Sequence, residues 1–543
     1  MSQVQHSLHE LLLLLQARSP SPHAALVVSA LLVCPLLVIL VVRLFGTAIA
    51  REQLLSKLPS PSFRLPIIGH LHLVGSLPHV SLRDLADKHG RDGLMLLRLG
   101  AVPTLVVSSP SAAQAVLRTH DHVFASRPYS PVTEILFYGP SDVAFCPYGE
   151  HWRHVKKIAT THLLTNRKVR SYRHVREHEA LIYPKVPGLD YRVMFVMAKI
   201  CNAASKCTSI DLSDLLSAFT SDIVCHVVSG KLFRKQGHDK LFRELIDANA
   251  LLIGGFNLED YFPMLVKLGI IKRMVCAKAR KINKMWDDLL NNLIDEHASK
   301  PTSEHDNEEN DFIDVLLSIQ HEYNLTRDHI KAQMAIMFEA GTDTSFIVLE
   351  YAMIRLVQNP RLMEKLQDEL RSSIPKGKEM VTEDDIKNLA YLEAVIKETL
   401  RLHMPAPLLV PHHSMVDCNI KGYKIPSGTR TIINSWALAR DPGSWENAQK
   451  FMPERFMDGG SAATMDYKGN DFAYLPFGTG RRMCPGFNFG IATVEIMLAN
   501  LVYRFNWKLP EESMKGGISM TELFGVTIRR KEKLLLVPIV LED

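Results

Sequence analysis

The sequence predicts a mainly α fold with a small β region, preceded by one N-terminal transmembrane helix. Thr326–Gln358 contains no proline and is expected to form one helix of roughly 50 Å. Alternating apolar residues predict two short strands, at Leu94–Leu99 and Thr104–Val107. Ala24–Val42 is uncharged over 19 residues, which is long enough for a helix that spans a bilayer.

The N-terminal region divides by composition into three parts. Residues 1–23 form an N-terminal segment, residues 24–42 the transmembrane anchor, and residues 43–69 a linker that ends in a proline-rich hinge. Lys and Arg are sparse before the anchor and more frequent after it, which predicts that the bulk of the chain is cytoplasmic. A cleaved signal peptide is the alternative, because Ala48–Ala50 looks like a cleavage site. The length of the apolar run favours a retained anchor.

The composition excludes several classes of protein. A net charge of +5 over 543 residues gives no case for nucleic-acid binding. The eight cysteines include no C-x-x-C pair, which argues against a zinc site, a c-type haem attachment and a disulfide framework. Residues 70–543 are expected to form one catalytic domain. Within it, residues 183–201 interrupt the helical pattern with Pro184, Pro187 and Gly188, and form either a surface insertion or a segment absent from the working protein.

Residues 151–180 carry eight Lys and Arg side chains against two Glu. A solvated face is the ordinary interpretation of such a run. The functional interpretation is a docking surface for an acidic redox partner. The sequence alone leaves both open.

Pro476–Gly486 is a glycine-rich stretch with a single cysteine, Cys484. Because glycine has no Cβ, the backbone can turn tightly and bring N–H groups close to the sulfur. Phe487–Phe505 is apolar on nearly every face, which predicts a buried helix directly after the turn. A cysteine before a helix N-terminus is favoured as a thiolate, and a thiolate is a good axial ligand for iron. A buried structural cysteine is the alternative.

The long middle helix contains a polar cluster, Ala340–Ser345, in an otherwise apolar stretch. Gly, Thr and Asp are poor mid-helix residues, and buried polar groups cost stability unless they are hydrogen-bonded. A solvated kink at Gly341 is one explanation. The other is catalysis, because the neighbouring Asp343 carboxylate and Thr344 hydroxyl can organise proton delivery.

These stretches resemble the cytochrome P450 family, and most closely its plant microsomal members of specialised metabolism. Phe477-x-x-Gly480-x-Arg482-x-Cys484-x-Gly486 is similar to the haem-binding loop of that family. The resemblance implies that Cys484 ligates haem iron, that Phe477 packs near the porphyrin and that Arg482 meets a haem propionate. Ala340–Ser345 resembles the oxygen-activating site, which implies that Asp343 relays protons and that Thr344 steadies iron-bound dioxygen and water.

The resemblance extends to a structural triad and to further haem contacts. Glu398 and Arg401 lie three apart on one helix face, and Arg455 resembles the arginine that completes the Glu-Arg-Arg triad of the family. Trp152, Lys156 and His412 stand at haem-contacting positions. Lys156 and His412 replace arginines that are usual there, and lysine lacks the bidentate fork of arginine.

The resemblance implies a haem b monooxygenase that inserts one oxygen atom from O₂ into a hydrophobic small molecule. Electrons would come from NADPH through a flavoprotein reductase, and the enzyme would be a single-pass protein of the endoplasmic reticulum membrane with its catalytic domain in the cytoplasm. A terpenoid substrate is favoured, with a phenylpropanoid or flavonoid as the alternative. The expected substrate pocket is apolar and includes Phe338, Ala340, Ala406, Leu409 and Val526.

Two other functions stay open. One is a haem-binding membrane protein without turnover. The second is a family member that acts as an isomerase or dehydratase, but the Asp343–Thr344 pair favours oxygen activation over this reading.

Overall fold

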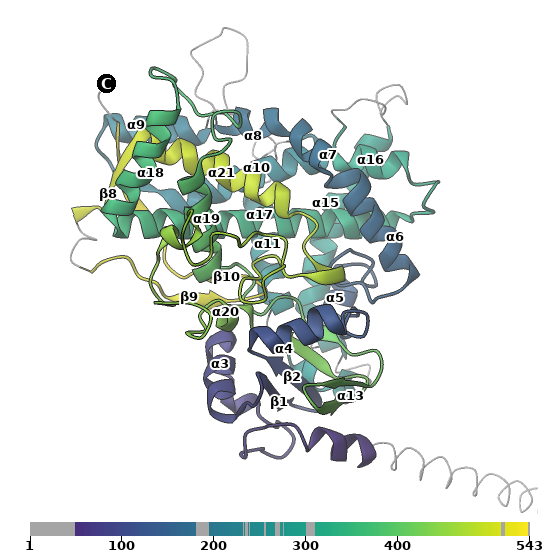
Figure 1. Ribbon diagram of the computed structural model, residues 1–543. Coiled ribbons are helices and arrows are strands. Elements are labelled where there is room, and N and C mark those ends of the chain that lie inside the picture. Colours follow the sequence, from purple (N-terminus) through teal and green to yellow (C-terminus); the bar gives the residue numbers. More distant parts are fainter. Residues whose placement is uncertain are drawn as a thin grey trace, which may run out of the picture. The chain divides into compact units, whose positions relative to one another are not determined.

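The computed structural model describes residues 49–180, 195–231, 233, 237, 239–254, 257–266, 272–274, 276–299, 310–511 and 516–540 (Figure 1). The chain separates into two compact units, Met1–Leu58 and Pro59–Asp543. In the part of the first unit that is described, residues 49–55 are helical. The predicted anchor, residues 24–42, lies outside the described residues. No helix within the described ranges is both long and apolar enough to cross a membrane.

Helices form most of the described part of Pro59–Asp543, as predicted. Their bounds are α3 Pro78–His89, α4 Pro110–Gln114, α5 Pro131–Leu136, α6 Glu150–Ile158, α7 Asn166–Ser171, α8 Arg173–Ala180, α9 Phe195–Ser205, α10 Leu212–Ser229, α11 Asp239–Gly254, α12 Leu258–Tyr261, α13 Pro263–Val266, α15 Ala277–Ala298, α16 Phe312–Ser318, α17 Arg327–Gln358, α18 Pro360–Ser373, α19 Ala390–Leu402, α20 Ser435–Leu438 and α21 Phe487–Arg504. The last seven residues of the segment 183–201 begin α9, whose Val196, Met197 and Ile200 are buried in the main core.

The β region of the described residues is small and divided among four short sheets. Its strands are β1 Leu94–Leu99, β2 Val102–Val107, β3 Ile210–Asp211, β4 His412–His413, β5 Cys418–Ile420, β6 Tyr423–Ile425, β7 Arg430–Ile433, β8 Phe505–Lys508, β9 Glu522–Phe524, β10 Ile528–Arg530 and β11 Leu535–Val540. The largest sheet has the order β1-β2-β7-β4, with β1 and β2 antiparallel and β2 and β7 parallel. The two strands predicted from the sequence are β1 and β2.

Helix α17 is the centre of the main core. The Thr326 hydroxyl caps its N-terminus by accepting from the His329 N–H, and Pro360 begins α18 two residues after its end. It packs against α10, α16, α19 and α21, and Figure 1 shows α10 and α21 alongside it. This packing explains why α17 is buried on most faces, and it confirms the predicted long helix and the predicted buried helix after Cys484.

Candidate active site

A cavity of about 290 Å³ lies between α17, the loop before α21 and the segment that leads into β4. Its walls are mostly apolar and include Val224, Val227, Val228, Ile336, Met337, Ala340, Phe489, Ile491 and Val494. Its polar side chains include Arg127, Lys156, Thr344, His412, Arg482 and Cys484. An apolar chamber with a few polar groups is typical of a site for a prosthetic group or a hydrophobic ligand.

Cys484 lies in the cavity wall at the end of a tight turn. Gly480 has a φ of 70°, which glycine adopts without strain. The turn allows the Cys484 N–H to donate to the Phe477 carbonyl at 3.0 Å. Burial raises the pKa of the Cys484 thiol, while the Gly486 backbone N–H and the Lys156 ammonium lower it. A thiolate at this position suits a metal cation, because a bound metal displaces the thiol proton.

Arg482 is held by main-chain carbonyls and by Trp152. Its Nε donates to the Ala125 carbonyl and its Nη2 to the Cys146 carbonyl, each at 2.6 Å. Its guanidinium lies 4.3 Å from the ring centroid of Trp152, whose indole N–H donates to the Val143 carbonyl at 3.1 Å. Burial lowers the pKa of Arg482 to about 10, so the side chain stays charged at neutral pH.

Arg127 also lines the cavity, and the sequence analysis missed it. Its Nε donates to the Ala144 carbonyl at 2.9 Å and its Nη1 to the Val410 carbonyl at 2.7 Å. Burial, reinforced by the neighbouring Arg482, lowers the pKa of Arg127. Within the described ranges, neither arginine has a carboxylate partner within ion-pair distance. The sequence signal was a lone arginine in the apolar stretch 123–128.

The two positions that depart from the family pattern both reach the cavity. The Lys156 ammonium donates to the Met483 carbonyl at 3.0 Å, and burial lowers the pKa of Lys156. His412 is buried, and burial lowers its pKa to about 3, so the imidazole is neutral at pH 7. Its Nδ1 donates to the Phe124 carbonyl at 2.7 Å. Lys156 therefore holds the cysteine loop in place, whereas His412 adds no charge.

The predicted oxygen-activating pair separates onto two sides of α17. Thr344 lines the cavity, where its hydroxyl donates to the Ala340 carbonyl at 2.6 Å. Asp343 points away from the cavity. Its Oδ1 lies 2.6 Å from Arg529 Nε, and its Oδ2 accepts a hydrogen bond from the Thr527 hydroxyl. Burial raises the pKa of Asp343, and the Arg529 charge opposes that effect.

Three of the five predicted pocket residues line the cavity: Ala340, Ala406 and Leu409. Val526 lines a neighbouring cavity of about 80 Å³, which shares Arg127, Leu409 and Val410 with the first. Phe338 is fully buried in the core, which corrects its assignment to the pocket. The reason is helical periodicity, because the neighbouring Met337 and Ala340 face the cavity while Phe338 turns into an aromatic cluster with Phe233, Phe242 and Trp286.

Comparison with known proteins decides the family. The family model for cytochrome P450 matches residues 59–537. The chain belongs to the cytochrome P450 family. Two maize (Zea mays) P450 relatives are indole-2-monooxygenase, 53% identical with 90% of this chain and 88% of the relative covered, and indolin-2-one monooxygenase, 51% identical with 92% and 94% covered. A third maize P450, 3-hydroxyindolin-2-one monooxygenase, is 51% identical, with 88% of each chain covered.

The fold agrees with solved P450 structures. A zebra fish cytochrome P450 solved with abiraterone has a TM-score of 0.69 and 23% identity, with 86% of this chain and all of that chain covered. The sequence comparisons identify this P450 as a haem monooxygenase of small plant metabolites, as the sequence analysis predicted.

The residues of the cavity fit the haem of a P450. Cys484 offers one soft sulfur ligand, and the walls around it are apolar. Arg127, Lys156 and Arg482 bring cationic side chains to the same cavity and suit the carboxylates of a porphyrin. Gly478 also lines the cavity, and a Cβ built there would come within 3.8 Å of Leu409 Cδ1, so the glycine keeps this part of the wall thin.

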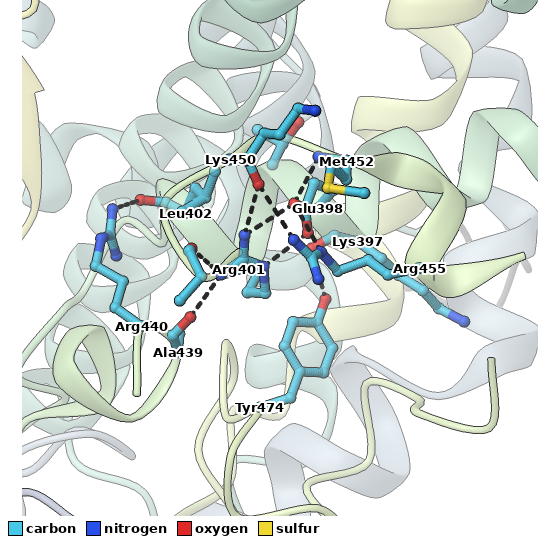
Figure 2. A network of polar contacts seen from close by, with 12 residues as sticks. Lys397, Glu398, Arg401, Leu402, Ala439, Arg440, Lys450, Met452, Arg455 and Tyr474 are labelled. Carbon is cyan, nitrogen blue, oxygen red and sulfur yellow. Dashed lines mark hydrogen bonds and ion pairs between the residues drawn. The ribbon is translucent and has the colours of Figure 1, made fainter. Parts of the chain in front are cut away.

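The predicted triad is fully formed in this P450 (Figure 2). Glu398 and Arg401 on α19 form a bidentate ion pair, with Nε–Oε2 at 2.7 Å and Nη2–Oε1 at 2.8 Å. Arg455, in the 3₁₀ segment Pro453–Phe456, reaches the same carboxylate at 3.2 Å. Arg401 also donates to the Ala439 carbonyl at 2.7 Å. The triad therefore ties α19 to the irregular segment that precedes the cysteine loop.

Proposed function

We propose that this P450 oxygenates a small molecule built on an indole ring. The observation that carries the proposal is the similarity, at 51–53% identity, to three maize enzymes whose names specify indole or indolinone substrates. The apolar cavity of about 290 Å³ supports a compact hydrophobic substrate, since the same space also serves the haem. The preference for a terpenoid, drawn from general resemblance, stays an untested prediction, and the relatives favour the indole class over it.

Haem supplies the oxygen chemistry when it is bound, and the side chains of this chain set its surroundings. Cys484 would hold the iron, and Arg127, Lys156 and Arg482 would hold the propionates. The apolar walls would exclude water and orient the substrate. Thr344 would hold a proton donor in the cavity, and Asp343 would carry protons from the opposite side of α17.

We also infer that electrons come from NADPH through a flavoprotein reductase. Arg153, Lys157, Arg167 and Arg170 are exposed on α6 and α7, which supports an acidic partner. The other four cations of the run are less exposed. Lys156 reaches the cavity, while Lys168, Arg173 and Arg176 bond to Asn310, Glu177 and Glu383.

We further propose that the enzyme acts at the endoplasmic reticulum membrane, anchored by residues 24–42 with its catalytic domain in the cytoplasm. Large apolar side chains support membrane contact by the catalytic domain, since Phe63 is 80% exposed, Ile67 83% and Met264 67%. Their segments adjoin one another, because the β1–β2 turn bonds to both the Ile68 and the Tyr261 carbonyl.

The test is a titration of the full-length, haem-loaded protein with indole and indolin-2-one, followed by turnover with NADPH and reductase. We expect a substrate-induced shift of the haem absorption band and a product heavier by one oxygen atom, formed only with O₂. Ala406→Phe, which fills the cavity wall, should abolish the shift, whereas Val416→Phe, at an exposed position outside the wall, should not. Turnover of a terpenoid but of neither indole compound would overturn the indole assignment. Product formed without O₂ would point to isomerase or dehydratase chemistry.

A further inference from the structure

Glu339 is a buried acid with no assigned role. It lies on α17 one turn before Asp343, is only 5% exposed, and does not line the cavity. Within the described part of the chain, neither of its carboxylate oxygens has a hydrogen-bond partner at normal distance, and the Asn249 side chain on α11 acts on it only as a weak donor. An ionised carboxylate in such a place would be very costly, because burial without a hydrogen bond or a cation strongly disfavours charge.

Among the described residues, Glu339, Asp343 and Asp247 form a cluster of three acids that shares one cation, Arg529. Arg529 on β10 pairs with both Asp343 on α17 and Asp247 on α11. The buried Asn249 of α11 lies near Glu339 and is uncharged. Burial raises the pKa of Glu339 well above its ordinary value, and the Asp343 charge adds to that effect while Arg529 opposes it. Burial and the excess of acids around Arg529 therefore favour the protonated form of Glu339.

The cluster also joins the interior to the surface. The Asp247 side chain is 59% exposed, Arg529 is 23% exposed, and Asp343 is 2% exposed. Glu339 and Asp343 are four residues apart on one helix, a spacing that places their Cβ atoms about 5–6 Å apart. The next residue along α17, Thr344, faces the cavity.

We propose that Glu339 is a proton-holding residue for oxygen activation, which passes its proton to Asp343 and regains one from solvent on the Asp247 side. In the transfer, the Glu339 O–H bond breaks and an Asp343 O–H bond forms. Glu339 becomes the carboxylate and Asp343 the neutral acid, and no electrons move. The net charge around Arg529 is the same before and after, so the energetic cost of the transfer is that of moving the negative charge from Asp343, which is paired with Arg529, to Glu339. The inference rests on monooxygenase activity and not on the indole substrate.

The first test needs no turnover. Infrared spectra of the haem-loaded, substrate-free protein at pH 7 are compared between wild type and Glu339→Gln. We expect the C=O band of a protonated carboxylic acid, shifted in D₂O, to be present in wild type and lost in the variant. Loss of carboxylate bands instead would show that Glu339 is ionised and would overturn the proposal.

The second test follows turnover in H₂O and D₂O. Glu339→Gln should lower the rate of product formation by about 10- to 100-fold and enlarge the solvent isotope effect. Its carbon-monoxide spectrum and unfolding temperature should match wild type, since glutamine has the same shape. Glu339→Asp keeps a titrating group and should restore part of the rate. Full activity of Glu339→Gln would overturn the proposal. Haem loss in Glu339→Gln that Glu339→Asp repairs would also overturn it, because that pattern indicates that Glu339 serves packing alone. A wrong substrate assignment would leave the infrared result unchanged.

Discussion

At the scale of single residues, main-chain carbonyls fix the direction of the cationic groups around the cavity. Arg482 and Arg127 donate their N–H groups to loop carbonyls, and among the described residues no carboxylate forms an ion pair with either, so only the more distant Asp142 offsets their charge. Such groups are expensive to bury and are stabilised by an anionic ligand. The positive charge in the cavity therefore favours the edge of a porphyrin that carries its two carboxylates.

The first prediction concerns the iron ligand. Cys484→Ser removes the thiolate, so the red-shifted carbon-monoxide band of the reduced protein should disappear. Cys146→Ser is the matched control, because Cys146 is buried nearby with its S–H donating to the Pro147 carbonyl and does not line the cavity. The measurement is the reduced carbon-monoxide difference spectrum of both variants. A band that survives in Cys484→Ser would refute the ligand assignment.

The second prediction concerns Arg127. Arg127→Gln removes a buried cation and leaves the Ala144 and Val410 carbonyls short of a donor, at a cost of about 1–3 kcal/mol in unfolding free energy. Haem should also dissociate faster, which transfer to an apo-globin acceptor would measure. Arg83→Gln is the control, since Arg83 forms an ion pair with Asp84 outside the cavity and should change neither quantity by much. Equal haem release from both variants would rule out a propionate contact.

At the scale of elements, the triad shows how a buried charge can order irregular backbone. One carboxylate on α19 accepts from two arginines, and those arginines in turn donate to carbonyls of the segment 439–450. A segment with few regular hydrogen bonds of its own is thereby fixed to a helix. Its rigidity sets the position of the cysteine loop further along the chain.

The third prediction tests this link. Glu398→Gln leaves Arg401 and Arg455 buried without their shared carboxylate, and we expect a loss of about 3–5 kcal/mol in unfolding free energy. Glu454→Gln is the control in the same segment. Its carboxylate is 39% exposed and pairs with Lys365, so about 0–1 kcal/mol is expected. Denaturant unfolding of both variants measures the difference, and similar losses would contradict a special role for the triad.

The fourth prediction is a pH dependence on α21. Burial, with Glu393 and Glu383 nearby, raises the pKa of Glu495 from 4.5 to about 7. The native state binds the Glu495 proton more tightly than the unfolded state does. The contribution of this proton to the free energy of unfolding is therefore complete below pH 4.5 and is lost as the pH rises to about 7. Glu495→Gln should remove this component and be more stable than wild type above pH 7, by up to about 3 kcal/mol. Unfolding at several pH values checks it, and a pH-independent difference between the two proteins would disprove the shift.

The sequence allowed the long helices to be predicted because prolines and apolar runs mark them. Pro360 ends the α17 pattern, and the apolar run after Gly486 became α21. Short strands such as β4 and β10 have two or three residues, too few for a periodic signal. The sequence placed Asp343 beside Thr344, but a helix turns neighbours to different faces.

Contacts between residues that are distant in sequence could not be predicted, because they depend on how the whole chain packs. Arg529 lies 186 positions after Asp343, and nothing in either segment marks the pairing. The pairing of Arg127 with the carbonyls of residues 144 and 410 depends in the same way on tertiary packing. Motif spacing finds residues that act within one loop or one helix turn, and it does not find contacts made by the folded chain.

At the scale of the whole molecule, the cavity and the two surfaces proposed for contact with the membrane and the reductase are formed by different residues. The apolar cavity is internal, the exposed apolar side chains near residues 63–68 and 264 face outward, and exposed cations lie on α6 and α7.

The fifth prediction is that reversing the charge of Arg153, Lys157 and Arg170 raises the reductase concentration needed for half-maximal turnover, and that added salt reduces the effect.

The control for that prediction reverses Lys421, Lys424 and Lys508, which are exposed cations outside α6, α7 and the segment 63–68. This triple variant should require as much reductase as wild type does. An equal rise in both triple variants would indicate a general charge effect, and no rise in the first would make the α6–α7 cations an ordinary solvated face.

The bonds of Arg482 also bear on how the enzyme is made. They join residue 482 to carbonyls at 125 and 146, which are 357 and 336 positions earlier in the chain. During synthesis at about 5–20 residues per second, the early segment therefore waits on the order of 20–70 s on the ribosome before its partner is translated. The cavity closes only after residue 482 is translated, so haem has to be captured by a chain of at least that length.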